Sequence, residues 1–443
     1  MVKGSAQQKT VVVGVAGGLL LLSGLGGGQA WAQNAPLKVD SGDTAWVLVS
    51  SAFVLAMLMP GLALFYGGLV RTKNVLGTIM QSVMILSVVS LLWILFGYSL
   101  AFGPDKGGVI GGLEWVGLSG VGSEPHPVYG PTIPHQAFML FQLMFAAIAP
   151  ALITGAFAER KRFTSVVLFA ALWSVFVYVP LAHWIWGGGW LAKLGALDFA
   201  GGAVIHISSG AAALVCAIVL GKRRGYGTDY MAPHNLPMTL LGTGFLWFGW
   251  FGFNGGSALG ANGIAVSAIV ATHAAAAMGA IAWCGAEWAH RGKPTVLGVA
   301  SGAVAGLATV TPAAGYIAPM SAIAIGLVAG MTCYAAIVWK GRFGYDDSLD
   351  VVGIHGVGGV IGILATGLFA SKVVNPGGAD GLFFGNPGLF GIQLLVAAVT
   401  TIFSIIGTFV ILKLVDSMTG LRVSSEEEAT GLDLSQHNER AYS

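Results

Sequence analysis

The amino-acid sequence predicts an all-α polytopic membrane protein. Only 9% of its 443 residues are charged and 55% are hydrophobic, whereas about 25% of a soluble domain is charged. Apolar stretches recur along the chain, and about twenty apolar residues are enough to cross a bilayer. Sixty-eight glycines suit helices that pack closely in lipid, where small residues let backbones approach one another. A soluble protein of this size could not cover its surface with so few charges.

The first residues have the pattern of a secretory signal. Two lysines precede an apolar run from Val11 to Leu22, and an A-x-A cleavage pattern ends at Ala32. We expect residues 1–32 to be removed, which leaves residues 33–417 as the transmembrane domain. The alternative is an additional uncleaved helix, but the apolar run is short and interrupted by glycine.

Eleven apolar segments follow in the mature chain, and the eighth is the shortest. We place them at residues 43–69, 77–103, 136–158, 163–187, 199–220, 236–256, 262–289, 296–312, 317–339, 350–370 and 390–415. An odd number of spans is consistent with two five-helix repeats in opposite orientation followed by one extra helix.

The basic residues of the loops support this count. Alternate loops carry twelve lysines and arginines, and the loops between them carry three. The twelve are Arg71, Lys73, Arg160, Lys161, Arg162, Lys222, Arg223, Arg224, Arg291, Lys293, Lys340 and Arg342; the three are Lys106, Lys193 and Lys372. Because positively charged loops stay in the cytoplasm, we expect the mature N-terminus outside and the C-terminus inside.

Two segments each combine a carboxylate at the membrane boundary with a histidine a short distance inside. Asp198 precedes His206 in span five, and Asp350 precedes His355 in span ten. Ionisable side chains at membrane depth are costly and usually face a cavity that serves a solute or a proton. In an inverted repeat the two histidines approach the centre from opposite faces, which predicts a pore at the repeat interface. The alternative is that both aspartates cap helices and both histidines belong to the core.

The chain shows no sign of an enzyme, a metal site or a nucleic-acid-binding protein. It contains no H-E-x-x-H, no phosphate-binding G-x-x-x-x-G-K-[ST] and no nucleophile elbow. Its three cysteines lie in apolar stretches without metal-ligand spacing, and its net charge is only +2. We therefore expect no cofactor and no metal.

Several motifs are specific when taken together. They are Phe65-Tyr66-Gly67-Gly68, Lys73-Asn74-Val75, Ala158-Glu159-Arg160, Trp186-Gly187-Gly188-Gly189, Asp198-Phe-Ala-Gly-Gly, Gly221-Lys222-Arg223, Gly249-Trp250-Phe251-Gly252-Phe253-Asn254, Val310-Thr311-Pro312 and Val352-Gly353-Ile354-His355-Gly356. From about residue 43 to the C-terminus, the chain resembles the ammonium transporter family (Amt/Mep/Rh), on its bacterial Amt branch. The resemblance implies a homotrimer in the bacterial inner membrane, with one nitrogen-uptake pore per subunit.

Carried over to matching positions, the resemblance implies a role for eleven residues. It implies an outer ammonium recruitment site at Phe141, Trp186 and Ser257, a gate of Phe145 over Phe253, a pore at His206 and His355, further pore-lining or supporting residues at Trp250, Tyr66 and Thr311, and a buried carboxylate near the outer site at Asp198. Without the resemblance, Phe141 and Phe145, four residues apart on one helix face, would be read as core aromatics.

The chemistry of these residue types is consistent with that expectation. Aromatic faces attract a cation, and a hydroxyl accepts its hydrogen bonds. Burial favours neutral imidazoles, which can pass a proton between them. Asp198 has two interpretations, a structural and electrostatic helix cap or a direct proton acceptor. Whether ammonia crosses alone or with a proton on a separate route stays open, as does the use of methylammonium.

The last segment, residues 418–443, resembles the cytoplasmic regulatory tail of the family, which helps to dock a PII-type signalling protein. Asn438 replaces a glycine in the family pattern, and asparagine tolerates positive φ better than other non-glycine residues. The alternatives are a solvated acidic segment, or an ammonium sensor that signals through this tail and a partner.

Overall fold

The computed structural model describes residues 37–442, so the predicted signal peptide at residues 1–32 lies outside the described part. Within residues 37–442, ten helical segments are long and apolar enough to cross a membrane. They are Ser41–Leu69, Thr72–Phe102, His135–Phe157, Phe163–Lys193, Gly202–Leu220, Leu236–Gly256, Gly263–Arg291, Pro319–Phe343, Val352–Phe369 and Pro387–Thr419. With the shorter apolar helix Val296–Val310, they correspond in order to the eleven predicted spans.

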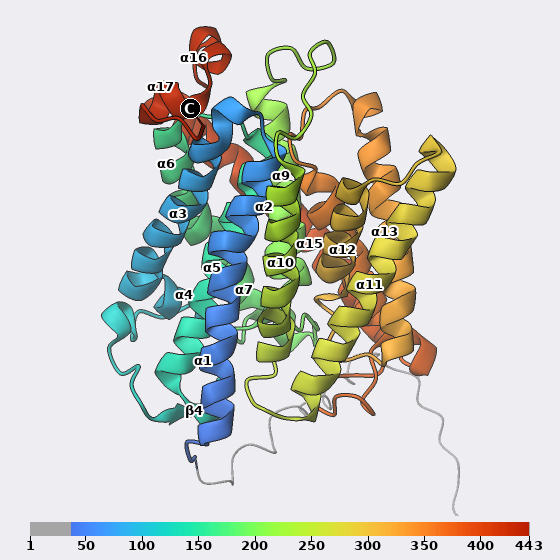
Figure 1. The fold of residues 1–443 in the computed structure, drawn as a ribbon. Coiled ribbons are helices and arrows are strands. Elements are labelled where there is room, and N and C mark those ends of the chain that lie inside the picture. Colours follow the sequence, from blue (N-terminus) through green and yellow to red (C-terminus); the bar gives the residue numbers. More distant parts are fainter. Residues whose placement is uncertain (1–36, 443) are drawn as a thin grey trace, which may run out of the picture. The chain divides into compact units, whose positions relative to one another are not determined.

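The helices run roughly parallel to one another (Figure 1). In chain order they are α1 (Ser41–Ala56), α2 (Ala63–Leu69), α3 (Val75–Leu92), α4 (Tyr98–Phe102), α5 (His135–Phe157), α6 (Phe163–Trp173), α7 (Val179–Ile185), α8 (Trp190–Lys193), α9 (Ser208–Leu220), α10 (Leu236–Gly256), α11 (Gly263–Arg291), α12 (Val296–Val310), α13 (Pro319–Phe343), α14 (Gly358–Phe369), α15 (Pro387–Thr419), α16 (Ser425–Thr430) and α17 (Leu432–His437). The short helix α12 packs against both α11 and α13, and these neighbours bury most of its residues.

Short turns and two hairpins complete the described part. Five π-helical turns interrupt or begin the spans: η1 (Met57–Leu62), η3 (Trp93–Gly97), η5 (Ser174–Tyr178), η6 (Gly202–Ile207) and η7 (Val352–Val357). The 3₁₀ turns are η2 (Thr72–Asn74), η4 (Val116–Leu118) and η8 (Leu382–Phe384), and the antiparallel pairs are β1 (Asp105–Lys106) with β2 (Ile110–Gly111) and β3 (Pro125–His126) with β4 (Gly130–Pro134).

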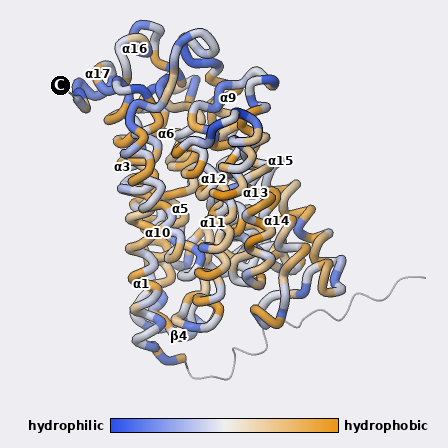
Figure 2. The backbone as a smooth tube through the Cα atoms, turned by 45° about the vertical axis from the view of Figure 1, so that its right-hand side comes forward, coloured by the Kyte–Doolittle hydropathy of each residue, from blue (hydrophilic) through white to orange (hydrophobic). Residues whose placement is uncertain are grey.

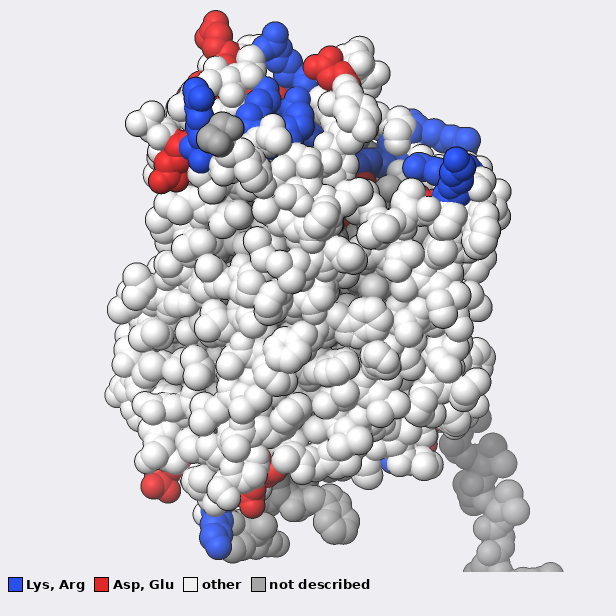
Figure 3. All heavy atoms as spheres, viewed as in Figure 1, with Lys and Arg blue, Asp and Glu red and all other residues white. Residues whose placement is uncertain are grey.

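The distribution of charge along the helices is that of a membrane protein. Hydrophobic residues dominate the central part of the bundle, whereas hydrophilic residues collect toward its ends (Figure 2). Lysine and arginine side chains gather at the end where α16 and α17 lie, and few appear at the opposite end (Figure 3). This asymmetry agrees with the alternation of basic loops in the sequence, from which we expect the basic end to face the cytoplasm. We call it the inner end and the opposite one the outer end.

A buried ion-pair network fixes the loops at the inner end. Glu159 is 1% exposed, and its carboxylate contacts the guanidinium groups of Arg71 at 2.8 Å and Arg223 at 3.2 Å. Burial alone would raise the pKa of Glu159, but Arg223 and Arg71 outweigh it and hold that pKa below its ordinary value. Arg223 also contacts Asp346 at 2.9 Å. The network joins four loops around the predicted pore exit.

The two histidine-bearing helices cross at glycines. A methyl group on Gly210 would overlap the backbone of Gly356, and one on Gly359 would press on the backbone of Ile207 and the side chain of His206. Gly210 and Gly359 each lie four residues after a predicted pore histidine, so the crossing has the approximate two-fold character of an inverted repeat. Only glycine permits so close an approach of two backbones.

We expect Gly210→Ala to lower the stability of the folded protein by about 1–3 kcal/mol, the usual cost of overpacking, because the crossing must open. The melting temperature in detergent would measure this loss. Gly244→Ala on α10 is the matched control, since a methyl group there meets open space. Equal melting temperatures for the two variants would contradict a close crossing.

Candidate functional site

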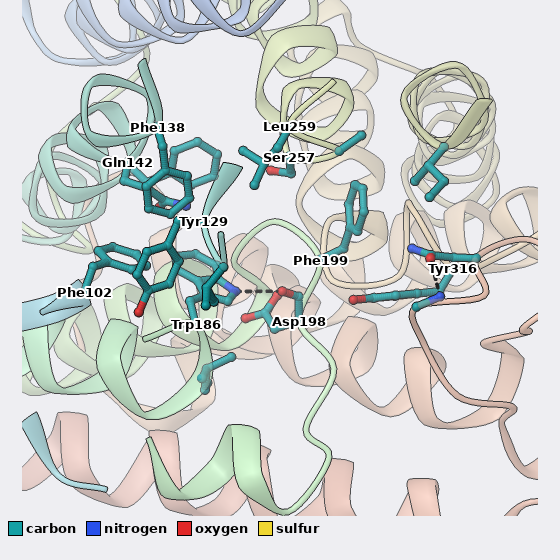
Figure 4. A pocket seen from close by; sticks show the side chains of 17 residues that line it. Phe102, Tyr129, Phe138, Gln142, Trp186, Asp198, Phe199, Ser257, Leu259 and Tyr316 are labelled. Atoms are coloured by element: carbon teal, nitrogen blue, oxygen red, sulfur yellow. Dashed lines mark hydrogen bonds between the residues drawn. The ribbon is translucent and has the colours of Figure 1, made fainter. Parts of the chain in front are cut away.

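A cavity of about 610 Å³ lies at the outer end of the bundle. Mainly aromatic and polar side chains from α4, α5, the end of α7, the β3–β4 hairpin, the start of α11 and four loops form its wall (Figure 4). The lining residues are Phe102, Val128, Tyr129, Phe138, Gln142, Phe145, Ile185, Trp186, Asp198, Phe199, Ser257, Ala258, Leu259, Ile264, Tyr316, Asn375 and Gly377. We call this cavity the outer vestibule.

Two of the three predicted recruitment residues line the outer vestibule directly. The Trp186 Nε1 donates to the backbone oxygen of Asp198 at 2.8 Å (Figure 4), which orients the indole ring. The Ser257 Oγ donates to the backbone oxygen of Phe253 at 2.8 Å, so its lone pairs stay available to accept a hydrogen bond. Phe141 is fully buried and lies behind Phe145, with 4.8 Å between ring centroids.

Of the two predicted gate residues, Phe145 lines the outer vestibule and Phe253 stacks on it. The rings of Phe145 and Phe253 stack with centroids 4.3 Å apart and planes 23° apart. Trp186 meets Phe145 edge to face at 6.0 Å. The rings of Phe145 and Phe253 are almost completely inaccessible, so passage beneath them requires a ring to move.

The two predicted pore histidines lie side by side below this gate. Their Nδ1 atoms are 3.2 Å apart and their ring centroids 5.1 Å apart. Such a contact requires one Nδ1 to carry a proton and the other to accept it. His206 also stacks on Phe253 at 6.2 Å and on Trp250 at 5.6 Å. The Nε2 of His206 is buried without a hydrogen-bond partner among the described residues.

A narrow apolar cavity continues below the histidine pair. Its wall includes His355, Trp250 and Tyr66, with Met57, Leu62, Phe65, Leu152, Leu246, Val304, Leu349, Val351 and Ile354. The Trp250 Nε1 donates to the Thr311 hydroxyl at 2.9 Å, so Thr311 fixes the indole instead of lining this cavity. The Tyr66 hydroxyl donates to the Leu152 backbone oxygen at 2.9 Å.

Among residues 37–442, no cluster of three metal-ligating side chains occurs.

Asp198 caps the turn that carries His206. Its two carboxylate oxygens accept hydrogen bonds from four successive backbone amides at 2.7–3.2 Å, those of Gly201, Gly202, Ala203 and Val204. The side chain is buried, and Asp198 is 5% exposed. This geometry is that of the structural alternative, in which a carboxylate satisfies the free amides at a helix start and places negative charge beside the outer vestibule.

The sequence analysis paired Asp198 with Asp350, and this pairing is wrong. Asp350 contacts Lys340, whereas the Val352 amide donates to Asp347 at 2.8 Å. Asp347 precedes His355 by eight residues, as Asp198 precedes His206. This equal spacing of eight residues was a signal in the sequence that could have identified Asp347. Asp350 was chosen instead because it lies closer to His355 in the chain. Asp347 is the inner counterpart of Asp198.

The tail folds onto the inner end of the same bundle. The Gly77 amide donates to Asp433 at 2.8 Å, and the Leu432 amide donates to Asn74 at 2.8 Å. Glu428 contacts Arg422 at 2.7 Å. Asn438 ends α17 with φ 53° and ψ 36°, so the expectation that asparagine preserves this turn is confirmed.

Comparison with known proteins agrees with the geometry. Residues 45–442 match the sequence profile of the Ammonium Transporter Family. The chain is 53% identical over 405 residues to a Bacillus subtilis protein named ammonium transporter, covering 91% of this chain and 99% of that protein. It is 50% identical over 404 residues to the ammonium transporter Amt1 of Archaeoglobus fulgidus, covering 91% and 100%.

Solved structures of other proteins have a similar fold. Candida albicans Mep2 matches with a TM-score of 0.82 at 36% identity, covering 88% of each chain. A structure described as a sensor Amt protein matches with a TM-score of 0.80 at 30% identity, covering 89% of this chain and 98% of the other. Near-complete sequence coverage and a common fold agree: this chain belongs to the ammonium transporter family.

Proposed function

We propose that this protein moves ammonium nitrogen across a membrane by recruiting ammonium in the outer vestibule, removing a proton and conducting ammonia past the histidine pair. The observation that carries the proposal is a pair of hydrogen-bonded imidazoles in a narrow apolar passage, directly below two stacked phenyl rings. Family membership supports ammonium as the substrate, and methylammonium is a further candidate.

The physical reason is the cost of charge in the membrane. Carrying a full charge through the bilayer centre costs at least about 2.5–3.5 kcal/mol. Trp186 offers a ring face that lowers the cost of desolvating the cation, and Ser257 offers a hydroxyl acceptor. Ammonium can then lose a proton and cross as a neutral molecule, which an alkali-metal cation cannot do. The apolar passage therefore selects by chemistry as well as by size.

The imidazole pair gives the released proton a separate route. Each neutral ring can donate one hydrogen bond and accept one, so a proton can enter one ring while another leaves its neighbour. Transport of ammonia and proton on adjacent routes would carry net charge.

In the proposed arrangement the protein is a homotrimer of the bacterial inner membrane, with its basic end in the cytoplasm.

The docked tail supports regulation at the inner end. Lys73 donates to the backbone oxygen of Glu428 at 3.1 Å, and the Arg224 amide donates to its carboxylate at 2.6 Å. The tail thus bridges two loops beside the proposed exit. We propose that a PII-type signalling protein docks here. Sensing is a second candidate function, favoured by this docked tail and by the likeness to a structure described as a sensor Amt protein.

Replacing either pore histidine tests the proton route. We expect His206→Ala and His355→Ala each to reduce the current evoked by an ammonium jump at least about tenfold, because proton transfer between rings is lost. His273→Ala is the control, since that exposed ring contacts Trp247 and Phe251 outside the pore. A current that persists in both pore variants would remove the relay. Uptake without current in the wild type would indicate a neutral-gas channel.

Replacing the vestibule indole tests recruitment. Losing a cation–π contact of about 0.5–2 kcal/mol in Trp186→Leu should raise the half-saturating ammonium concentration about 2- to 30-fold while the maximal current persists. Trp184→Leu, on the same helix but outside the vestibule wall, should leave half-saturation unchanged. Equal half-saturation in wild type and Trp186→Leu would argue against an aromatic recruitment site.

The turn at Asn438 tests the docking of the tail. A β-branched residue at positive φ costs about 1–2 kcal/mol, so Asn438→Val should increase protease cleavage of the tail about 5- to 30-fold. Asn438→Gly should resist cleavage like the wild type, because glycine adopts this conformation freely. If both variants were cleaved at the wild-type rate, the turn would not hold the tail.

A further inference from the structure

Asp347 is a buried carboxyl group that the proposed pathway does not use. It is 0% exposed and lies between α13 and η7, before the turn that carries His355. Its Oδ2 accepts the Val352 amide at 2.8 Å, and its backbone oxygen accepts the Lys340 ammonium at 2.7 Å. Its Oδ1 is buried without a partner among the described residues.

The comparison with Asp198 shows how unusual this environment is. Both carboxylates precede a pore histidine by eight residues, and both accept the amide five residues ahead, from Ala203 or Val352. Asp198, however, accepts four amides, so both of its oxygens are satisfied. The free oxygen of Asp347 is costly to bury as part of an anion. The two carboxylates therefore occupy equivalent positions in the two halves of the chain. At the outer end both oxygens accept hydrogen bonds, whereas at the inner end only one does.

We propose that Asp347 is a positioning residue for His355 and that only its ionised form holds the inner histidine in the conducting arrangement. The inference rests on the proposed transport through the histidine pair. An anion at the start of η7 stabilises the free amides and the positive end of the turn. Protonation removes this charge from the start of the turn. The Val352 amide that Asp347 binds lies only three residues before His355, in the same turn. A displacement of about 1 Å is enough to disrupt a positioned reaction partner.

The charges around Asp347 set the pH at which this happens. Burial raises the pKa of Asp347 to about 6, Lys340 on α13 lowers it, and Asp350 in the same loop raises it. Further titratable groups near it are Arg160 from the α5–α6 loop, Tyr66 on α2, and Tyr345 and Asp346 in the same loop. Asp347 is therefore ionised at neutral cytoplasmic pH and becomes protonated as the inner side turns acidic, which lowers conduction.

Excised patches with the inner face toward the bath test this directly. With ammonium and pH fixed on the outer side, the bath is taken from about pH 8 to about pH 5. We expect the wild-type inward current to fall with a midpoint near the pKa of Asp347, and by about tenfold one pH unit below it. If acid acted only on ammonia, it would convert ammonia on the inner side to ammonium and raise the inward current. Protonation of Asp347 should lower that current, so the sign of the change distinguishes the two effects.

Two variants make the assignment specific. Asp347→Asn keeps an amide acceptor but cannot ionise, so its current should be low and independent of bath pH. Asp350→Asn removes a nearby negative charge and should keep the wild-type current at neutral pH, with a midpoint lower by a few tenths to about one pH unit. The second variant keeps the test decisive if Asp347→Asn does not fold.

Three outcomes would overturn the inference. They are a wild-type current that does not fall on acidification, a normal fall in Asp347→Asn, and an unchanged midpoint in Asp350→Asn. A wild type without ammonium current at any bath pH would instead overturn the proposed transport, and the role of Asp347 with it.

Discussion

The hydrogen bond between the two imidazoles is the interaction on which the rest of this structure depends. It joins side chains that are 149 residues apart in the chain and arrive from opposite ends of the bundle. For the rings to meet, their backbones must approach more closely than any side chain would allow. Gly210 and Gly359 provide that approach. The cost is the flexibility that glycine brings to the unfolded chain, and the surrounding helices must offset it.

The start of each histidine-bearing segment follows from the same constraint. A π-helical turn widens the backbone locally, and η6 and η7 both contain their histidine. Free amides at the start of a buried turn must find partners, because an unpaired backbone group is costly to bury. On the outer side Asp198 supplies four hydrogen bonds. On the inner side Asp347 accepts fewer and keeps one oxygen unpaired among the described residues, so the two halves share a geometry but not a set of hydrogen bonds.

The vestibule and the tail place polar chemistry at the two ends of an otherwise apolar passage. At the outer end, ring faces and a hydroxyl surround a cavity large enough for a hydrated cation. At the inner end, Glu159 and Arg223 tie together the loops through which the passage must open. The tail rests on neighbouring loops through Asp433 and Glu428. The tail and the Glu159–Arg223 ion pair are therefore joined through neighbouring residues of one loop, Arg223 and Arg224.

The sequence alone determined the helical class, the order of the spans and the two histidine-bearing segments. Hydropathy and the alternation of basic loops are properties of local composition, and the lipid environment enforces them on every segment independently. The resemblance to the family also singled out Trp186, Ser257, Phe145 and Phe253, which are neighbours in the structure.

Only the tertiary structure decided which groups touch. It shows Phe141 behind Phe145, Thr311 as the partner of Trp250, and Asp347 in the place that the sequence analysis gave to Asp350. In each case the deciding factor is the direction of a side chain after distant backbones have packed. A carboxylate caps the amides that it can reach, and Asp350, at φ 64°, turns toward Lys340 instead. Proximity along the chain does not report that direction.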